Sequence, residues 1–303
     1  MQSYQLRALV AVADAGSITA AARSLGISQP AVTRALKQLE IDLRATLLYR
    51  NNAGVALTEF GAALVSHARL ILKATDKAEQ HIAQMVDARG GTLSVASSAT
   101  PFMLVLPSAL ELVRRQFTGL DVRLQEAVYP TILGLFRDGS IDFAIGPVPA
   151  EGLGTDFTCD PLFEVELAVV LRRGHRLAHL NSLQDLSTLD WILTGPRNGP
   201  GAIHEQAFRG AGLEPPVCLT HCESASATVH FVAHSDAASF VPRPIAEAFE
   251  RSRLVTVVNI AEPTPPMRIS LVRPNQSILT PGGQALFSAI RTVSRSLTGA
   301  KPL

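Results

Sequence analysis

The 303-residue chain contains little cysteine, few aromatic residues and almost no net charge. Its three cysteines (Cys159, Cys218 and Cys222) are too few for the disulfide framework of a secreted protein and fit a reducing cytosol. The longest charge-free stretch, residues 90–110, is broken by hydroxyl residues and prolines, so it is no membrane span. The N-terminal apolar stretch is interrupted by Asp14 and does not resemble a signal peptide. We therefore expect a cytoplasmic protein, and exclude secreted, membrane-embedded and collagen-like classes.

The charges are unevenly distributed, although the whole chain carries only +1. Residues 1–90 hold 10 basic and 7 acidic side chains, and the remainder holds 17 and 19. Arginine supplies 23 of the 27 basic residues, which suits phosphate or carboxylate recognition and equally fits biased codon usage. The length and the 47% hydrophobic content predict two or three domains with large cores.

Residues 1–57 predict a winged helix-turn-helix. Apolar residues at helical spacing predict a first helix that ends at Gly16, and a second helix spans 18–25 with Ser17 as its N-cap. Ser28 is the expected N-cap of a third helix, in which Pro30 occupies the first turn. Two short helices joined by a glycine turn are typical of the helix-turn-helix. Residues 47–57 then place an Asn/Gly turn between apolar runs, which predicts a β-hairpin wing.

A long helix is expected to follow, from the N-cap Thr58 to about Ala88. Apolar residues recur along it at seven-residue intervals: Leu57, Leu64, Ile71, Ala78 and Met85. A helix with so narrow an apolar stripe is expected to pair with a second copy. The alternative is a helix that packs on its own globular domain.

From Thr92 onward the pattern alternates between strands and helices. The expected strands are 93–96, 122–126, 143–145, 166–171, 191–194, 217–220, 238–241 and 269–272. The expected helices are 101–117, 130–138, 201–210, 225–233 and 282–297. This alternation predicts parallel α/β sheets, and its length predicts two subdomains with a cleft between them.

Two segments resemble the N-terminal signature of LysR-type transcriptional regulators: residues 20–40, AAARSLGISQPAVTRALKQLE, and residues 47–61, which begin LLYR and end LTEFG. Thr33 replaces the commoner serine and keeps the hydroxyl. The resemblance implies a winged helix-turn-helix over 1–57, a linker and dimerisation helix over 58–90, and a two-lobed α/β effector domain over 91–303 that resembles type 2 periplasmic binding proteins. The first lobe is expected at 91–162 and 268–303, and the second at 163–267.

The function implied by this resemblance is sequence-specific regulation of transcription, controlled by a small-molecule effector. The expected partners are double-stranded promoter DNA, the effector, RNA polymerase and further copies of the chain, as a homodimer or homotetramer. No cofactor, metal or membrane partner is expected. A branch containing toluenesulfonate-responsive and galactose-binding-protein regulators is similar over parts of residues 199–243, which suggests a sulfonate, an aromatic acid or a sugar derivative.

A recognition helix presents its N-terminal residues to base edges in the major groove. Gln29 can pair with adenine, Thr33 can bond a base or touch a thymine methyl, and Arg34 can bind guanine or a phosphate. Hydroxyls at helix starts lie where free backbone N–H groups attract phosphate, although simple capping is an equal reading for Ser28. The expected DNA-contacting residues are Thr19, Ser28, Gln29, Pro30, Thr33, Arg34, Lys37, Arg50, Asn51 and Asn52.

The effector is expected between the lobes, where two strand-to-helix turns offer hydroxyls or free N–H groups to a small anion. By their position in the resemblance, Ser98 and Thr100 form the hydroxyl-bearing part of this site, with helix capping as the alternative. The remaining expected effector residues are Tyr129, Pro147, Gly201, Ala202 and Ile203.

Two other classes of protein stay open on the sequence. A solute-binding protein would share the cleft but would have no use for the helix-turn-helix. An enzyme would need a nucleophile, a base or a metal cluster, and no such arrangement has credible spacing. His221, His230 and His234 lack a further ligand at metal-binding spacing, and Cys218 and Cys222 are better explained as small buried hydrophobes than as a redox switch.

Overall fold

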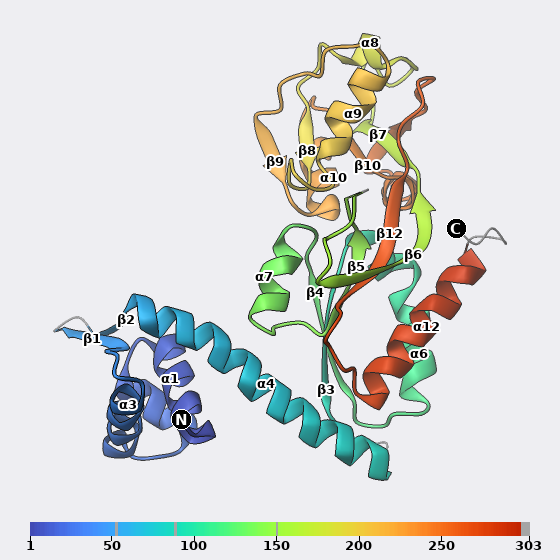
Figure 1. Ribbon diagram of the computed structural model, residues 1–303. Coiled ribbons are helices and arrows are strands. Elements are labelled where there is room, and N and C mark those ends of the chain that lie inside the picture. The colour runs from blue at the N-terminus through green and yellow to red at the C-terminus, as the bar shows by residue number, and fades with distance from the viewer. Residues whose placement is uncertain (52–53, 88–89, 150, 298–303) are drawn as a thin grey trace. The chain divides into compact units, whose positions relative to one another are not determined.

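The computed structural model describes residues 1–51, 54–87, 90–149 and 151–297 (Figure 1). The chain divides into two compact units. The first is Met1–Ile82 with Arg137–Ser140, and the second is Ala83–Phe136 with Ile141–Leu303. Within the described ranges, no helix is long and apolar enough to cross a membrane.

The first unit begins with a winged helix-turn-helix, as predicted. Its elements are α1 (Ser3–Ala15), α2 (Ile18–Leu25), α3 (Gln29–Leu43), β1 (Leu48–Asn51) and β2 (Gly54–Leu57). Left-handed glycines end the first two helices (φ +60° at Gly16 and +66° at Gly26), a conformation that glycine adopts without steric cost. Leu9, Leu36 and Leu39 are fully buried in a shared core.

The junction between α3, the hairpin and the next helix is closed by polar contacts. Glu40 accepts hydrogen bonds from the backbone N–H groups of Leu47 (2.8 Å) and Leu48 (3.3 Å). Thr58 caps the following helix, as predicted, because its Oγ1 accepts from the N–H of Gly61 at 3.0 Å. A side chain at Gly61 would place a Cβ 2.1 Å from the Leu47 carbonyl oxygen, so only glycine fits there. These contacts hold the wing against α3.

The long helix α4 spans Glu59–Asp87, close to the predicted bounds. Val65 and Ala68 are buried on one face of it. The seven-residue stripe is more open: Ile71 is 42% exposed and Met85 is 68% exposed. An apolar stripe of this kind remains available to a second copy of the helix.

In the second unit, one group of elements, here called the first lobe, surrounds a five-stranded sheet ordered β4-β3-β5-β12-β6 (Figure 1). The strands are β3 (Thr92–Ser97), β4 (Asp121–Glu126), β5 (Phe143–Pro147), β6 (Phe157–Val165) and β12 (Met267–Pro274). The helices are α5 (Ala99–Leu104), α6 (Leu106–Arg114), α7 (Thr131–Arg137) and α12 (Pro281–Leu297). Buried residues of β3, β5, α6 and α12 form its main core.

The second lobe contains a three-stranded sheet, β10-β7-β11, and a parallel pair, β8-β9. Its strands are β7 (Leu167–Arg172), β8 (Ile192–Thr194), β9 (Thr220–Cys222), β10 (Ser239–Pro242) and β11 (Val255–Val258). Its helices are α8 (Leu183–Leu186), α9 (Ala202–Gly210), α10 (Ala225–Ala233) and α11 (Arg243–Arg251). Strands β6 and β12 pair along their whole length and connect the two lobes.

Several sequence-based expectations are corrected by the structure. The five-stranded sheet is mixed, because β3 is parallel to β4 and β5 whereas β12 is antiparallel to both β5 and β6. The three-stranded sheet is antiparallel, because β7 is antiparallel to both of its neighbours, whereas the β8-β9 pair is purely parallel, as predicted. The helix predicted over 101–117 is broken at Val105, since Pro107 offers no backbone N–H to continue it. The strand predicted over 217–220 begins only at Thr220. Val217 and Leu219 are instead 77% and 88% exposed.

Candidate DNA-binding surface and effector cleft

The N-terminal half of α3 presents an exposed polar face. Val32, Leu36 and Leu39 point into the core and are fully buried. The expected DNA-contacting residues lie on the opposite side: Ser28, Gln29, Pro30, Arg34 and Lys37 are exposed, and Thr33 is half-buried. Because the helix is anchored by its apolar face, these side chains are free to meet another molecule.

The charge of this face is positive. Over the described ranges, neither Arg34 nor Lys37 has an ion-pair partner. Both line a shallow surface pocket with a volume of about 470 Å³. Its other lining residues are Tyr4, Ala31, Ala35, Gln38 and Ile41. Two unpaired cations on an exposed helix attract phosphate groups.

The two expected capping serines differ. Ser17 caps α2 by accepting a hydrogen bond from the N–H of Ala20 (3.5 Å), and Thr19 is exposed beside it. Ser28 stands at the N-cap position of α3, but its side chain makes no capping hydrogen bond. Its hydroxyl therefore remains available. The side chains of Arg50 and Asn51 and the whole of Asn52 lie outside the described residues.

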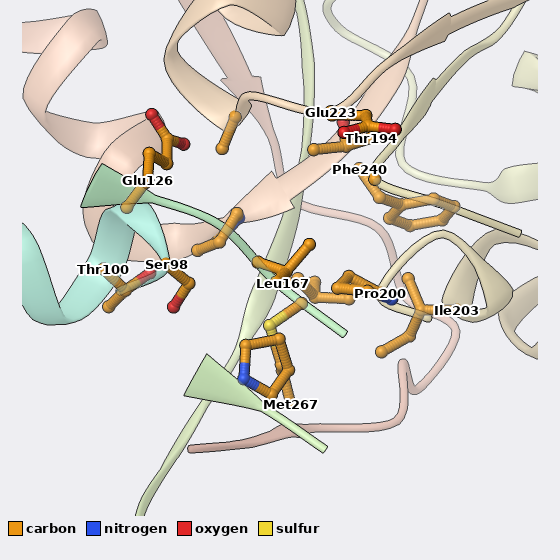
Figure 2. Close-up of a pocket in the computed structure, with 16 residues that line it drawn as sticks. Ser98, Thr100, Glu126, Leu167, Thr194, Pro200, Ile203, Glu223, Phe240 and Met267 are labelled. Carbon is orange, nitrogen blue, oxygen red and sulfur yellow. The ribbon is translucent and has the colours of Figure 1, made fainter. Parts of the chain in front are cut away.

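A small cavity of about 40 Å³ lies between the two lobes (Figure 2). The first lobe contributes Ser98, Thr100 and Glu126, and the second contributes Glu223 and Phe240. The volume is enough for a few water molecules and too small for an organic ligand. An organic ligand that fills this cavity would therefore require the surrounding residues of the two lobes to move apart.

Within the described part of the chain, Ser98 places a buried hydroxyl without a hydrogen-bond partner at this cavity. Its backbone N–H donates to the Ile145 carbonyl (2.9 Å), which fixes it at the start of α5. The side chain is 7% exposed, caps no helix, and its Oγ has no hydrogen-bond partner among the described residues. Helix capping therefore does not account for this hydroxyl. A buried hydroxyl without a partner costs stability unless a ligand or water bonds it.

The expected effector residues are divided between two adjoining cavities. Ser98 and Thr100 line the small one, whereas Tyr129 and Ala202 line a second cavity of about 570 Å³. Pro147 and Ile203 line both, together with Pro200 and Met267. Gly201 lines neither, because a Cβ there would lie 2.6 Å from the Gly195 carbonyl oxygen. Gly201 therefore allows the loop to pack closely against residues 195–196 and presents no surface to either cavity.

The carboxylates at the small cavity were not anticipated from the sequence. Glu126 is the last residue of β4, and Glu223 follows β9. Glu126 Oε2 accepts a hydrogen bond from Oγ of Ser224, the N-cap residue of α10 (3.3 Å), so a carboxylate already lies beside the start of that helix. None of the described residues that line this cavity is basic. The anion expected from the helix N-termini therefore finds no cationic partner here.

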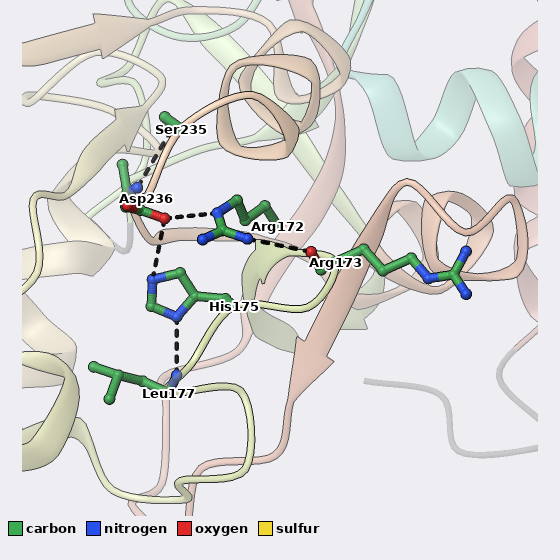
Figure 3. Close-up of polar contacts among 7 residues, drawn as sticks. Arg172, Arg173, His175, Leu177, Ser235 and Asp236 are labelled. Carbon is green, nitrogen blue, oxygen red and sulfur yellow. Dashed lines mark hydrogen bonds and ion pairs between the residues drawn. The ribbon is translucent and has the colours of Figure 1, made fainter.

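An Asp–His pair in the second lobe bears on the enzyme alternative (Figure 3). Asp236 accepts from Arg172 Nε at 2.6 Å and lies 3.8 Å from His175 Nε2. The hydrogen bond from Arg172 lowers the pKa of Asp236, and burial lowers the pKa of His175. His175 Nδ1 accepts from the N–H of Leu177 (3.1 Å), so neither ring nitrogen is left to serve as a base. This cluster is structural.

His204, His234 and Cys218 also have structural contacts. His204 is buried against Trp191, and its Nε2 lies 3.1 Å from the Pro216 carbonyl oxygen and 3.4 Å from Cys218 Sγ. Burial raises the pKa of the Cys218 thiol, which disfavours the reactive thiolate. His234 Nδ1 lies 2.9 Å from the His230 carbonyl oxygen, on its own helix. Across the described chain, no three His, Cys, Asp or Glu residues are grouped as a metal site would require.

Comparison with known proteins matches both parts of this architecture. Residues 4–62 match the family of the bacterial regulatory helix-turn-helix protein, lysR family, and residues 87–295 match the LysR substrate binding domain. The chain is 26% identical over 292 residues to the transcriptional regulator GbpR of Azospirillum brasilense, covering 95% of this chain and 85% of that protein. It is 29% identical over 271 residues to a probable hydrogen peroxide-inducible genes activator of Mycobacterium avium, covering 88% and 86%.

Solved structures share the fold over nearly the whole chain. The LysR family regulator CbnR superposes with a TM-score of 0.73 at 24% identity, covering 97% of this chain and 99% of that one. Full-length CbnR in complex with its target DNA gives a TM-score of 0.72 at the same identity, covering 97% and 100%. With a helix-turn-helix at one end and a two-lobed domain at the other, both matched by family, the chain belongs to the LysR family of DNA-binding transcriptional regulators.

Proposed function

We propose that this regulator binds promoter DNA through α3 and its wing, as a homodimer or homotetramer, under the control of a small molecule held between the lobes. The observation that carries the DNA-binding part is the exposed, unpaired pair Arg34 and Lys37 on an α3 that is buried on its other face. Gln29, Thr33 and Arg34 read base edges, whereas Lys37 and the hydroxyls of Thr19 and Ser28 bind phosphates. Pro30, in the first turn of α3, also contacts the DNA, and Arg50, Asn51 and Asn52 contact it from the wing.

The open apolar stripe of α4 supports self-association. Ile71 and Met85 expose apolar surface on a helix that is long enough to pair with a second copy. Paired helix-turn-helix domains read a partial palindrome. RNA polymerase is a further partner, because a regulator bound at a promoter meets it there, and the place of action is the cytoplasm, where the promoter lies.

Control by the effector acts through the arrangement of the lobes. The unpartnered Ser98 hydroxyl and the two adjoining cavities support a ligand site in the cleft between the lobes. Thr100, Tyr129, Pro147, Ala202 and Ile203 form its walls. A ligand that binds one lobe arrangement better shifts the population toward it, and thereby changes the spacing of the DNA-binding domains in the oligomer.

Arg34→Ala tests the DNA-binding part of this proposal. Fluorescence anisotropy measures the affinity of the full chain for the DNA upstream of its own gene at physiological salt. Losing a base or phosphate contact of this kind costs about 1–3 kcal/mol, so we expect binding about 10- to 100-fold weaker with the fold intact. Arg115→Ala is the matched control, since it removes an exposed arginine from the end of α6. Equal affinity of wild type and Arg34→Ala would remove Arg34 from the interface.

A further inference from the structure

The charges that line the small cavity all have one sign. Of the sixteen described lining residues, the ionisable ones are Glu126 and Glu223, and both are exposed. Neither forms an ion pair with a described Lys, Arg or His. Carboxylates gathered without a cation create a negative potential in a partly enclosed space.

The two carboxylates come from opposite lobes. Glu126 ends a strand of the first lobe, and Glu223 precedes the N-cap of α10 in the second. The hydrogen bond from Ser224 Oγ to Glu126 Oε2 (3.3 Å) places the first carboxylate next to the residue that follows Glu223. Each lobe therefore presents one carboxylate to the same cavity, and a cation held there can interact with both lobes.

Ser98 is an independent sign that a ligand belongs in this cavity. Its side chain is more than nine-tenths buried, it lines the same cavity, and its Oγ lacks a partner among the described residues. The rest of the wall is mainly apolar and includes Leu167, Met267 and the ring of Phe240. An aromatic ring beside carboxylates favours a positively charged group.

We propose that the cavity binds a small organic cation, an amine with an apolar body, whose charge is neutralised by Glu126 and Glu223 together. This inference rests on the proposed function, in which the cleft is the effector site. The ammonium group is attracted to a carboxylate on each lobe, and the apolar body packs against Phe240 and Leu167. Ser98 Oγ accepts an N–H of the ligand. A carboxylate ligand would add a third negative charge to the same space.

The test uses the full-length protein in phosphate buffer, since common amine buffers would compete for the site. Thermal unfolding is followed with butylamine, benzylamine and 1,4-diaminobutane, and with butyrate, benzoate, succinate, butanol and benzyl alcohol as matched probes. The variants are Glu126→Gln and Glu223→Gln, which keep the side-chain shape. Glu214→Gln, on an exposed glutamate of the second lobe, is the control.

We expect at least one amine to stabilise the wild type at a concentration about tenfold lower than its matched carboxylate or alcohol. The half-saturating concentration of that amine should rise about tenfold or more in Glu126→Gln and in Glu223→Gln, and stay unchanged in Glu214→Gln.

Three results would overturn the cation assignment: a carboxylate or alcohol that stabilises better than its amine, an amine response that persists in both variants, or no response to any of the amines. DNA binding is measured on the same samples. If the wild type binds its upstream DNA but the amine measurements give one of these three results, the proposed function stands and the cation assignment is wrong. If it binds no such DNA, the proposed function itself fails, whatever the amines do.

Discussion

Gly199→Ala probes the contact that holds the two lobes together beside the cleft. Gly199 lies in the loop before α9, in the second lobe, and faces the backbone of Tyr129 in the first. A Cβ at this glycine would lie 2.3 Å from the Tyr129 carbonyl oxygen and 3.3 Å from its carbonyl carbon. Both groups belong to the backbone, so no side-chain rotation can relieve the overlap.

The size of the effect follows from that geometry. The approach falls about 0.7 Å short of the 3.0 Å that Cβ atoms keep from their neighbours, so either the loop or the lobes must shift. Overpacking of this kind costs about 1–3 kcal/mol of unfolding free energy. Gly210→Ala is the matched control, because Gly210 lies in α9 and a methyl group there would meet no atom within 4 Å. Alanine there should stabilise the helix by about 0.5–1 kcal/mol.

Urea unfolding of the full chain, followed by tryptophan fluorescence, measures both effects. Trp191 is the single tryptophan of the sequence and is 2% exposed in the second lobe, so its emission reports on this domain. We expect a lower midpoint for Gly199→Ala and a higher one for Gly210→Ala. If Gly199→Ala unfolds at the wild-type midpoint while the control is stabilised, the second lobe does not rest on the backbone of Tyr129 in the first.

Two further predictions concern other parts of the chain. Glu40→Ala leaves the buried N–H groups of Leu47 and Leu48 without an acceptor and should cost about 2–4 kcal/mol, whereas Glu40→Gln keeps an acceptor and should cost about 1 kcal/mol. Thermal unfolding followed by circular dichroism checks that order, and equal losses would contradict it. Burial lowers the folded-state pKa of His204 below its ordinary 6.5, so the unfolded chain binds more protons between those two pKa values. The contribution of His204 to stability should be full above pH 6.5 and fall as the pH drops through that window. Urea midpoints measured from pH 7.5 to 5.5 should fall less in His204→Gln than in the wild type. An identical fall in both proteins would exclude His204 as its source.

The helix-turn-helix could be predicted closely because its signals are local. Ser17 and Thr58 cap the helices that follow them, and Gly16 and Gly26 end the helices before them. Each signal needs only neighbours within one turn of helix, so the sequence alone carries it. The exception is Ser28, where the same residue type at the same position makes no capping bond.

The effector domain was harder to predict because its decisive pairings are distant in sequence. Strand β12 pairs with β6 across about a hundred residues, and its antiparallel direction cannot be inferred from alternating elements. Strand β6 itself went unpredicted, since Asp160, Pro161 and Glu164 hide its apolar alternation. The helix α11 was also missed, although Ile245 and Ala246 are buried on its inner face.

The candidate effector site shows the same limit in its chemistry. Hydroxyls at strand-to-helix turns were foreseen because a turn and a hydroxyl are adjacent in sequence, and Ser98 lines the cavity accordingly. The charge of the site was not foreseen, because Glu126 and Glu223 are far apart in sequence and come to line one cavity only when the two lobes are folded and placed together. Seen one at a time, each is an ordinary surface carboxylate, and the free N-terminus of α10 favours an anion. Once Glu126 accepts the hydrogen bond of Ser224, that N-terminus already has its negative partner. The cleft then favours a cationic ligand over an anionic one, because a charged ligand that enters it meets carboxylates and, among the described lining residues, no basic side chain.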